Sequence, residues 1–236
     1  MGNTAVIKNS DAGRMTSKNS GLASAPVLPT SSSRLNRDRQ ILDAAILIFS
    51  EKGYAAASLQ DVAEAVGLLK GSLYHYISSK ESLLFRIFQE MHAEGRQLMT
   101  QVDAMDLPPE EQLREFLERL TLINLEHHER ATLCFSEWRH LTGEASVTVR
   151  RQRREFEAYL RRIITNATAA GHTRDGIDHK IATSYIWSAL NGVLVGYRPR
   201  PGLSPKRLAA EVADLSCAAV LTVRRPANQA SRVRSA

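Results

Sequence analysis

Apolar positions recur at helical spacing along most of the chain, beginning near residue 33. The N-terminal part predicts three short helices, at about 33–52, 59–66 and 69–77. Gly53 and Gly67 directly follow the first two, where a left-handed cap is common. Ser58, three residues before Asp61, is placed to open the second helix, and Ser79 to open a fourth.

The pattern stays helical beyond residue 80, with few signals for strands. Further helices are predicted at about 80–104, 109–128, 131–141, 146–170, 178–195 and 205–223. Ser204 before Pro205 is a strong start signal for the last of them. No long repeat is visible, so we expect an all-α fold rather than a solenoid.

Composition agrees with a soluble globular protein, at 43% hydrophobic and 24% charged residues. Two distant cysteines, Cys134 and Cys217, provide neither a disulfide framework nor a zinc spacing. The N-terminus has no apolar run of signal length. These features predict a cytoplasmic protein that has no membrane partner.

The net charge of +6 is concentrated in two tails. Residues 1–35 carry +3 and residues 224–236 carry +4, which leaves −1 for the residues between. Residues 1–33 are rich in Ser, Thr, Ala, Asn and Gly and predict a disordered arm, and 224–236 a basic tail. The basic charge alone therefore indicates solubility or non-specific phosphate binding rather than sequence-specific binding of a nucleic acid.

The region around residues 59–77 has the pattern of a helix-turn-helix. Val62 and Val66 form an apolar stripe, Ala63 permits a close helix crossing, and Leu73 and Tyr76 point back at the stripe. The outward face of the second helix then carries Lys70, Ser72, Tyr74 and His75. These side chains suit the major groove of DNA, whereas the alternative is an ordinary helical hairpin with a solvated polar face.

The run from Arg39 to Leu84 resembles the N-terminal DNA-binding domain of the TetR family of bacterial repressors. The matching positions are Phe49, Gly53, Tyr54, Ala63, Gly67, Gly71, Leu73, Tyr74 and Ser79-Lys80-Glu81. The resemblance implies that Lys70, Ser72, Tyr74 and His75 enter the groove. It also implies a phosphate clamp made of Ser58, Tyr76 and Lys80. Leu69 departs from the family's usual Ser or Thr helix cap, and Ile77 from its usual Phe.

The resemblance implies that the later helices form a ligand cavity and pair with a second copy of the chain. Two apolar stripes are candidates for the pocket: Phe116, Leu120, Ile123 and His127, and Phe156, Leu160, Ile163 and Ala167. Core packing is the alternative for both. The candidate dimer residues are Tyr185, Ala189, Val193, Leu208, Val212, Leu215 and Ala219, with burial inside one chain as the alternative.

The segment from Leu190 to Leu208 resembles the corresponding part of TetR-type repressors of steroid and fatty-acid breakdown. That resemblance implies an acyl-CoA-like or other hydrophobic effector. A basic cluster would then meet effector phosphates, with a solvated face as the alternative; it comprises Arg150, Arg151, Arg153 and Arg154.

Enzyme chemistry has no support, because no nucleophile elbow, phosphate loop or metal-binding spacing is present. We expect no cofactor and no metal. The domain prediction is a three-helix DNA-binding domain over 34–82 followed by a helical ligand-binding and dimerisation domain over 83–223. The favoured function is a homodimeric transcriptional repressor that binds double-stranded operator DNA and is released by a small-molecule effector. The competing hypothesis is a helical carrier protein whose helix-turn-helix does not touch DNA.

Overall fold

The computed structural model describes residues 31–222, with side chains from residue 34 onward. The helices are α1 (Ser31–Lys52), α2 (Leu59–Ala65), α3 (Lys70–Leu73), α4 (Lys80–Asp103), α5 (Pro109–Glu126), α6 (His128–Ser136), the short 3-10 helix η1 (Glu137–His140), α7 (Gly143–Ala169), α8 (His179–Gly196) and α9 (Pro205–Val220). Between residues 31 and 222 only two isolated bridges interrupt this pattern. The predicted all-α fold class is confirmed.

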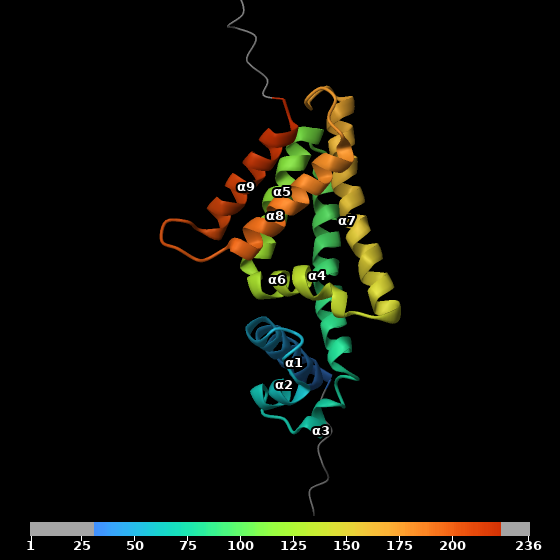
Figure 1. Ribbon diagram of the computed structural model, residues 1–236, viewed down its shortest axis with the longest axis vertical. Coiled ribbons are helices and arrows are strands. Elements are labelled where there is room, and N and C mark those ends of the chain that lie inside the picture. The colour runs from blue at the N-terminus through green and yellow to red at the C-terminus, as the bar shows by residue number, and fades with distance from the viewer. Residues whose placement is uncertain (1–30, 223–236) are drawn as a thin grey trace, which may run out of the picture.

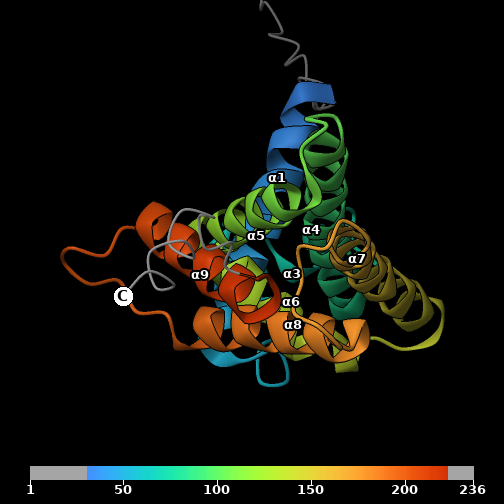
Figure 2. The same cartoon turned by 90° about the horizontal axis from the view of Figure 1, so that it is seen from above.

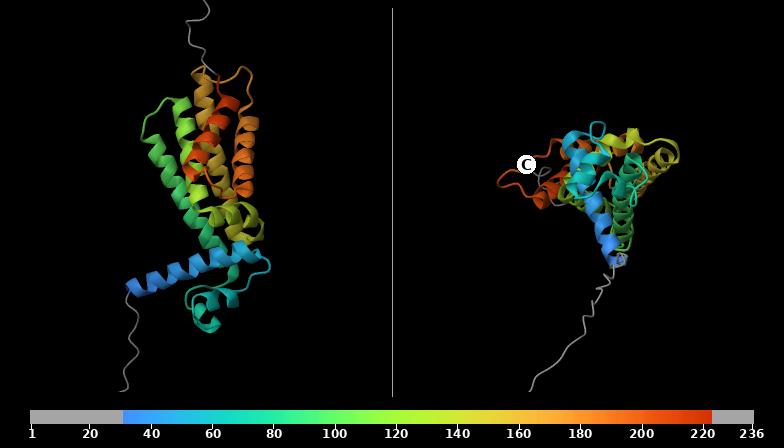
Figure 3. Two further views of the ribbon diagram at one scale, coloured as in Figure 1. Left: turned by 90° about the vertical axis from the view of Figure 1, so that its left-hand side faces the viewer. Right: turned by 90° about the horizontal axis from the view of Figure 1, so that it is seen from below.

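The helices form a small lower unit and a larger upper bundle that share one helix (Figure 1). The lower unit contains α1, α2 and α3, and α4 runs from it up into the bundle. Seen from above in Figure 2, α5 lies inside the bundle; it packs against α4, α7, α8 and α9. Figure 3 shows α1 crossing beneath the bundle, and α6 contacts both α1 and α8.

The predicted helix caps are present. Ser58 and Asp61 form a reciprocal capping box at α2, in which the Ser58 hydroxyl accepts from the Asp61 amide at 3.2 Å. Ser79 caps α4, and Ser204 caps α9 by accepting from the Arg207 amide. Each side chain satisfies a backbone donor that the first helical turn leaves free.

Several predicted helix bounds differ by up to three residues from the structure, and two differences change the description of an element. The third helix is shorter than predicted, because only 70–73 is helical and residues 74–76 form a turn. Its N-cap residue, Leu69, makes no side-chain hydrogen bond to the helix, as expected from an apolar residue there. The segment predicted at 131–141 begins earlier, at His128, and tightens into η1 after Ser136.

The buried side chains form two main cores, one above the other. The lower core joins α1, α2 and α3 to the first turns of α4 and to residues of α6 such as Leu133. The upper core joins α4, α5, α7, α8 and α9. Along α4 the lower core ends at Phe88 and the upper begins at Leu98, so the lower core continues past the predicted domain boundary at 82/83.

The predicted terminal segments fall mostly beyond the described part of the chain. Helix α1 begins at Ser31, inside the range assigned to the arm, while residues 1–30 and 223–236 lie outside the described residues. Among residues 31–222, no helix combines the length and the apolarity needed to cross a bilayer.

Candidate functional site

The helix-turn-helix is built around a tightly packed inner face. Val62, Ala63 and Leu73 are each 0% exposed, so α2 and α3 cross closely over small and branched side chains. Gly67 has a φ of +65°, a backbone conformation that β-branched residues adopt only with strain. The turn between the two helices therefore depends on glycine at this position.

Helix α3 and the turn after it carry polar side chains that the rest of the chain leaves uncovered; Tyr74 and His75, predicted on the helix, lie in that turn. Lys70, Tyr74 and His75 are exposed, and Ser72 is half-buried. Leu69 precedes them and is 80% exposed, an unusual environment for a leucine. The helix and the turn together expose cationic, hydroxyl, imidazole and methyl groups, which match the donor, acceptor and methyl pattern of a major groove.

The three residues assigned to the phosphate clamp are largely used within the chain. The Ser58 hydroxyl belongs to the α2 capping box, and Tyr76 packs partly against the lower core. Lys80 donates from Nζ to the carbonyl oxygens of Ala55 at 3.2 Å and Ala57 at 2.6 Å. Its ammonium also lies 4.4 Å from the centre of the Tyr54 ring, and burial lowers the pKa of Lys80. Lys80 thus ties the loop between α1 and α2 to the start of α4.

A cavity of about 110 Å³ lies where the two cores meet. Its walls come from α4, α5, α6, α7 and α8: Phe88, Met91, His92, Gly95, Leu120, Ile123, Asn124, Phe135, Val149, Gln152, Arg153, Phe156, Glu157, Trp187 and Asn191. Most of these side chains are apolar or aromatic, with a few polar groups among them, which is the usual composition of a small-molecule site.

The predicted pocket residues divide into two groups. Leu120, Ile123 and Phe156 line the cavity. Phe116 and Leu160 are wrong as wall residues: both are 0% exposed, and Phe116 packs against the Tyr159 ring at 4.8 Å between centres, one turn deeper in the upper core. His127 is also wrong, because it is the exposed residue at which α5 ends.

Several wall residues were missed by the sequence analysis, above all those of α4. A glycine in the middle of a long predicted helix was the available signal, since glycine there usually marks a close approach. A Cβ built on Gly95 would lie 2.2 Å from the Phe156 ring, so the two helices meet closely at this point. On α7, Arg153 of the basic cluster lines the cavity, whereas Arg150, Arg151 and Arg154 are exposed, as the alternative interpretation held.

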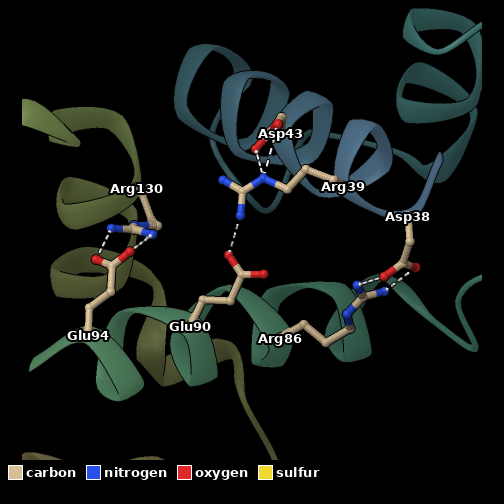
Figure 4. Close-up of polar contacts among 7 residues, drawn as sticks. All are labelled: Asp38, Arg39, Asp43, Arg86, Glu90, Glu94 and Arg130. Carbon is tan, nitrogen blue, oxygen red and sulfur yellow. Dashed lines mark hydrogen bonds and ion pairs between the residues drawn. The ribbon is translucent and has the colours of Figure 1, made fainter. Parts of the chain in front are cut away.

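Opposite faces of α4 contact the cavity and the lower unit. Arg86, Glu90 and Glu94 follow each other at four-residue spacing and point toward α1 and α6 (Figure 4). Arg86 donates to both carboxylate oxygens of Asp38, and Arg39 donates to Glu90 at 3.0 Å.

On α6, the buried Arg130 donates a hydrogen bond from each of its two terminal nitrogens to the carboxylate of Glu94 (Figure 4). Bidentate pairs of this kind fix the relative orientation of two elements. The same ten-residue stretch of α4 therefore contacts the cavity through Phe88, Met91, His92 and Gly95, and the lower unit through Arg86 and Glu90.

Comparison with known proteins gives matches over both units. The family model described as "Bacterial regulatory proteins, tetR family" matches residues 41–87. A second, described as "Tetracyclin repressor-like, C-terminal domain", matches residues 106–220. The chain belongs to the TetR family. It is a DNA-binding transcriptional regulator.

Individual relatives resemble this TetR-family chain over most of their length. The HTH-type transcriptional repressor KstR2 of Rhodococcus jostii is 26% identical over 179 residues, covering 74% of this chain and 86% of the relative. Among solved structures, the ketosteroid regulator KstR2 of Mycobacterium tuberculosis has a TM-score of 0.74 at 18% identity, over 79% of this chain and 96% of that one. AibR, solved with isovaleryl coenzyme A and operator DNA, has a TM-score of 0.67 at 23% identity, over 76% and 97%. These two structural likenesses concern the fold.

The structure separates the TetR-family chain's predicted dimer residues by exposure. Tyr185 and Leu215 are 57% and 73% exposed, on the outer faces of α8 and α9. Ala189, Val193, Leu208 and Ala219 are partly buried. Val212 is wrong as an interface residue, because it is 5% exposed and belongs to the upper core. The open face of α8 instead continues from Tyr185 to Ile181 and Val195.

Proposed function

We propose that this protein is a cytoplasmic, homodimeric repressor whose affinity for operator DNA falls when a small molecule fills the cavity. The observation that carries the proposal is the double role of α4. Its residues 86–95 form one wall of the cavity and also hold α1 of the helix-turn-helix. A ligand that favours a different position of α4 would therefore change the position of α3 as well.

The DNA contacts follow from the exposed side chains of α3 and of the turn after it. Tyr74 and His75 are placed to meet base edges, with Lys70 and Ser72 beside them, within a DNA-binding domain proposed at residues 34–82. Leu69 adds an exposed apolar group at the start of the helix, suited to the methyl group of thymine. Ser58, Tyr76 and Lys80 then act mainly by stabilising the structure of the helix-turn-helix unit. Contact with DNA phosphates is their secondary role.

Dimerisation would use the open faces of α8 and α9. Ile181, Tyr185 and Val195 on α8 and Leu215 on α9 are all more than half exposed, which is costly for large apolar side chains in a lone chain. A second copy that covers them through a twofold axis would place two recognition helices on one duplex. Such dimers read half-sites about 34 Å apart, one helical turn of DNA.

The effector chemistry begins with the apolar walls of the cavity. An acyl group or ring of a few carbon atoms fits a cavity of about 110 Å³ lined mainly by Phe, Met, Leu, Ile and Trp. Arg153, at the cavity, and exposed Arg150, Arg151 and Arg154 beside it on α7 are available to a larger ligand with a phosphate-bearing part.

Titration against DNA tests the proposal. An operator is first selected by the wild-type chain from a pool of random duplexes, and each variant is then titrated against operator and scrambled duplex at several salt concentrations. Tyr74→Ala and His75→Ala should each lose about 1–3 kcal/mol more binding free energy for the operator than for scrambled DNA. The reason is that a contact to a base distinguishes one sequence from another. Lys80→Ala should lower the melting temperature while leaving the operator preference in place, because Lys80 holds the loop before α2. Failure to enrich any duplex would instead support a helical carrier protein.

A further inference from the structure

Two polar atoms in the cavity wall lack a hydrogen-bond partner within the described residues. They are Nε1 of Trp187, a donor, and Oδ1 of Asn191, both buried. Leaving a buried donor or acceptor unpaired is unfavourable, and proteins usually avoid it unless a water or a ligand completes the pair. Both atoms belong to the same cavity, so one bound molecule can contact both side chains.

The two side chains that carry these atoms lie on adjacent turns of α8 and line the same cavity as one cation, Arg153. Trp187 and Asn191 are four residues apart on α8 and therefore lie on one face, one turn apart. On α7, which packs against α8, the Phe156 ring lies edge-on to Trp187 at 6.3 Å between centres. Arg153 precedes Phe156 by three residues, so the antiparallel register places Arg153 at the level of Asn191.

Arg153 is half-buried and forms no ion pair with a carboxylate in the described part of the chain. Its guanidinium lies 5.1 Å from the centre of the Trp138 ring, which holds it in place without neutralising it. Burial lowers the pKa of Arg153, with Glu157 opposing that shift from one turn away. Glu157 also lines the cavity, but it is exposed and water screens its charge, whereas a half-buried guanidinium favours an anion that can reach it inside the cavity.

Among the described wall residues, no second cation is free for a ligand. His92 pairs with Glu155 at 3.1 Å, and burial lowers the pKa of His92, which favours its neutral form. Besides Trp187 and His92, the aromatic wall residues are Phe88, Phe135 and Phe156, of which Phe156 contacts the Trp187 ring. One cation beside aromatic walls suits a monoanion with an apolar body better than a dianionic phosphate, which would need more donors.

We propose that the cavity binds a small apolar carboxylic acid, with its carboxylate between Arg153, the Trp187 indole and the Asn191 amide. This inference rests on the proposed effector site. The two carboxylate oxygens accept from the guanidinium and from the Trp187 N–H, and the Asn191 amide can turn to donate as well. The apolar body lies among the Phe side chains, with aromatic edges available to a ring.

A matched series of small molecules tests the ligand class without DNA. The probes are benzoate, benzamide and benzyl alcohol, titrated calorimetrically into the full-length chain, because one ring with one polar group suits a cavity of about 110 Å³. The acid should bind about ten-fold or more tightly than the amide and the alcohol, the difference expected from a charge-assisted contact. Equal affinities for the three molecules, or no binding of any, would overturn the inference.

Variants then assign the contact to its residues. Arg153→Gln should remove the preference for the acid, and Arg153→Lys should keep part of it because the charge remains. Lys206→Gln, which removes an exposed cation of α9 that is not part of the cavity, is the control and should bind like the wild type. Trp187→Phe keeps an aromatic ring but removes the N–H, so it should weaken binding of the acid more than binding of the alcohol. If Arg153→Gln still prefers the acid while its melting temperature matches that of Lys206→Gln, the assignment is wrong.

Operator binding in the presence of the acid separates this inference from the proposed function. Acid that binds through Arg153 and also lowers operator affinity supports both. Acid that binds through Arg153 but leaves operator affinity unchanged supports the ligand class and contradicts the role of the cavity as an effector site.

Discussion

The helix-turn-helix and the upper bundle arrange polar and apolar groups in opposite ways. In the helix-turn-helix the interior is filled, with Val62, Ala63 and Leu73 fully buried, and the polar side chains proposed to contact DNA are exposed. In the bundle the open faces of α8 and α9 are apolar, and unpartnered polar atoms lie inside, at the cavity. The first arrangement suits a rigid surface that is read from outside. The second suits a body that gains stability when a ligand and a second copy complete it.

The largest effects should distinguish the inside from the outside of α9. Val212→Glu would bury a charge in the upper core, so the bundle should lose about 3 kcal/mol or more and unfold at a much lower temperature. Leu215→Glu, three residues further on and 73% exposed, should change the stability of a single chain by less than about 0.5 kcal/mol. It should nevertheless break the dimer, because the twofold axis would bring like charges together.

Thermal unfolding and sedimentation equilibrium of both variants measure these two effects. A Leu215→Glu protein that remains dimeric would move the interface away from this face of α9. A Val212→Glu protein that melts like the wild type would mean that the packing of α9 on α5 is wrong.

Two glycines with positive φ, one in each region, can be substituted to introduce the same backbone strain in one region at a time. Gly67, in the helix-turn-helix, has a φ of +65°, and Gly171, after α7, has a φ of +73°. A Cβ on either would meet nothing within 4 Å, so the cost of substitution is conformational. Gly67→Val and Gly171→Val should each cost about 1–3 kcal/mol.

Only Gly67→Val should abolish operator binding, and both proteins should remain dimeric in gel filtration. Equal loss of operator binding in the two variants would show that the helix-turn-helix depends on the whole bundle. Unchanged binding by Gly67→Val would place the DNA-reading surface elsewhere.

A smaller effect concerns acid sensitivity at the start of α2. The pKa of Asp61 is lowered to about 2. The hydrogen bond from the Lys52 ammonium is the largest cause, and the hydrogen bonds from Ser58 are the next. Since the pKa is lower in the folded chain, the stabilisation is present above the ordinary value of 3.8 and is lost as the pH falls toward 2. The melting temperature of the wild type should therefore exceed that of Asp61→Asn at pH 5, and the gap should close between pH 4 and 2. A gap that is constant over this range would show that the carboxylate charge is not what stabilises the cap.

The two regions also differ in how far sequence reasoning could reach. The helix-turn-helix is specified by neighbours in sequence: a cap at Ser58, a turn at Gly67 and a stripe at Val62 all act within a few residues. The caps and the first two helices were predictable for that reason, whereas the third was predicted too long. The internal use of Lys80 was not predictable, because its carbonyl partners lie 23 and 25 residues away in an irregular loop.

The cavity depends on five helices brought together by tertiary packing. Helical spacing showed that Phe116, Leu120 and Ile123 share an apolar face, but it could not show which turn of that face meets a void. The same limit applies to Val212 and Leu215 on α9. Only the position of α5 relative to α9 decides which of the two side chains is buried. Gly95 was the local clue to the position of the cavity, because helix interiors otherwise disfavour glycine.

The central claim is that the cavity controls DNA binding through α4, and Gly95→Ala tests it most directly. The new methyl group would lie 2.2 Å from the Phe156 ring and must push that ring into the cavity or α4 away from α7, as a bound ligand would. Alanine favours the helix, so folding should be preserved. Gln97→Ala, exposed on the same helix, is the control. In a titration against the selected operator, Gly95→Ala should bind at least about five-fold more weakly than Gln97→Ala, with an equal or higher melting temperature. Equal operator affinities for the two variants would contradict the account.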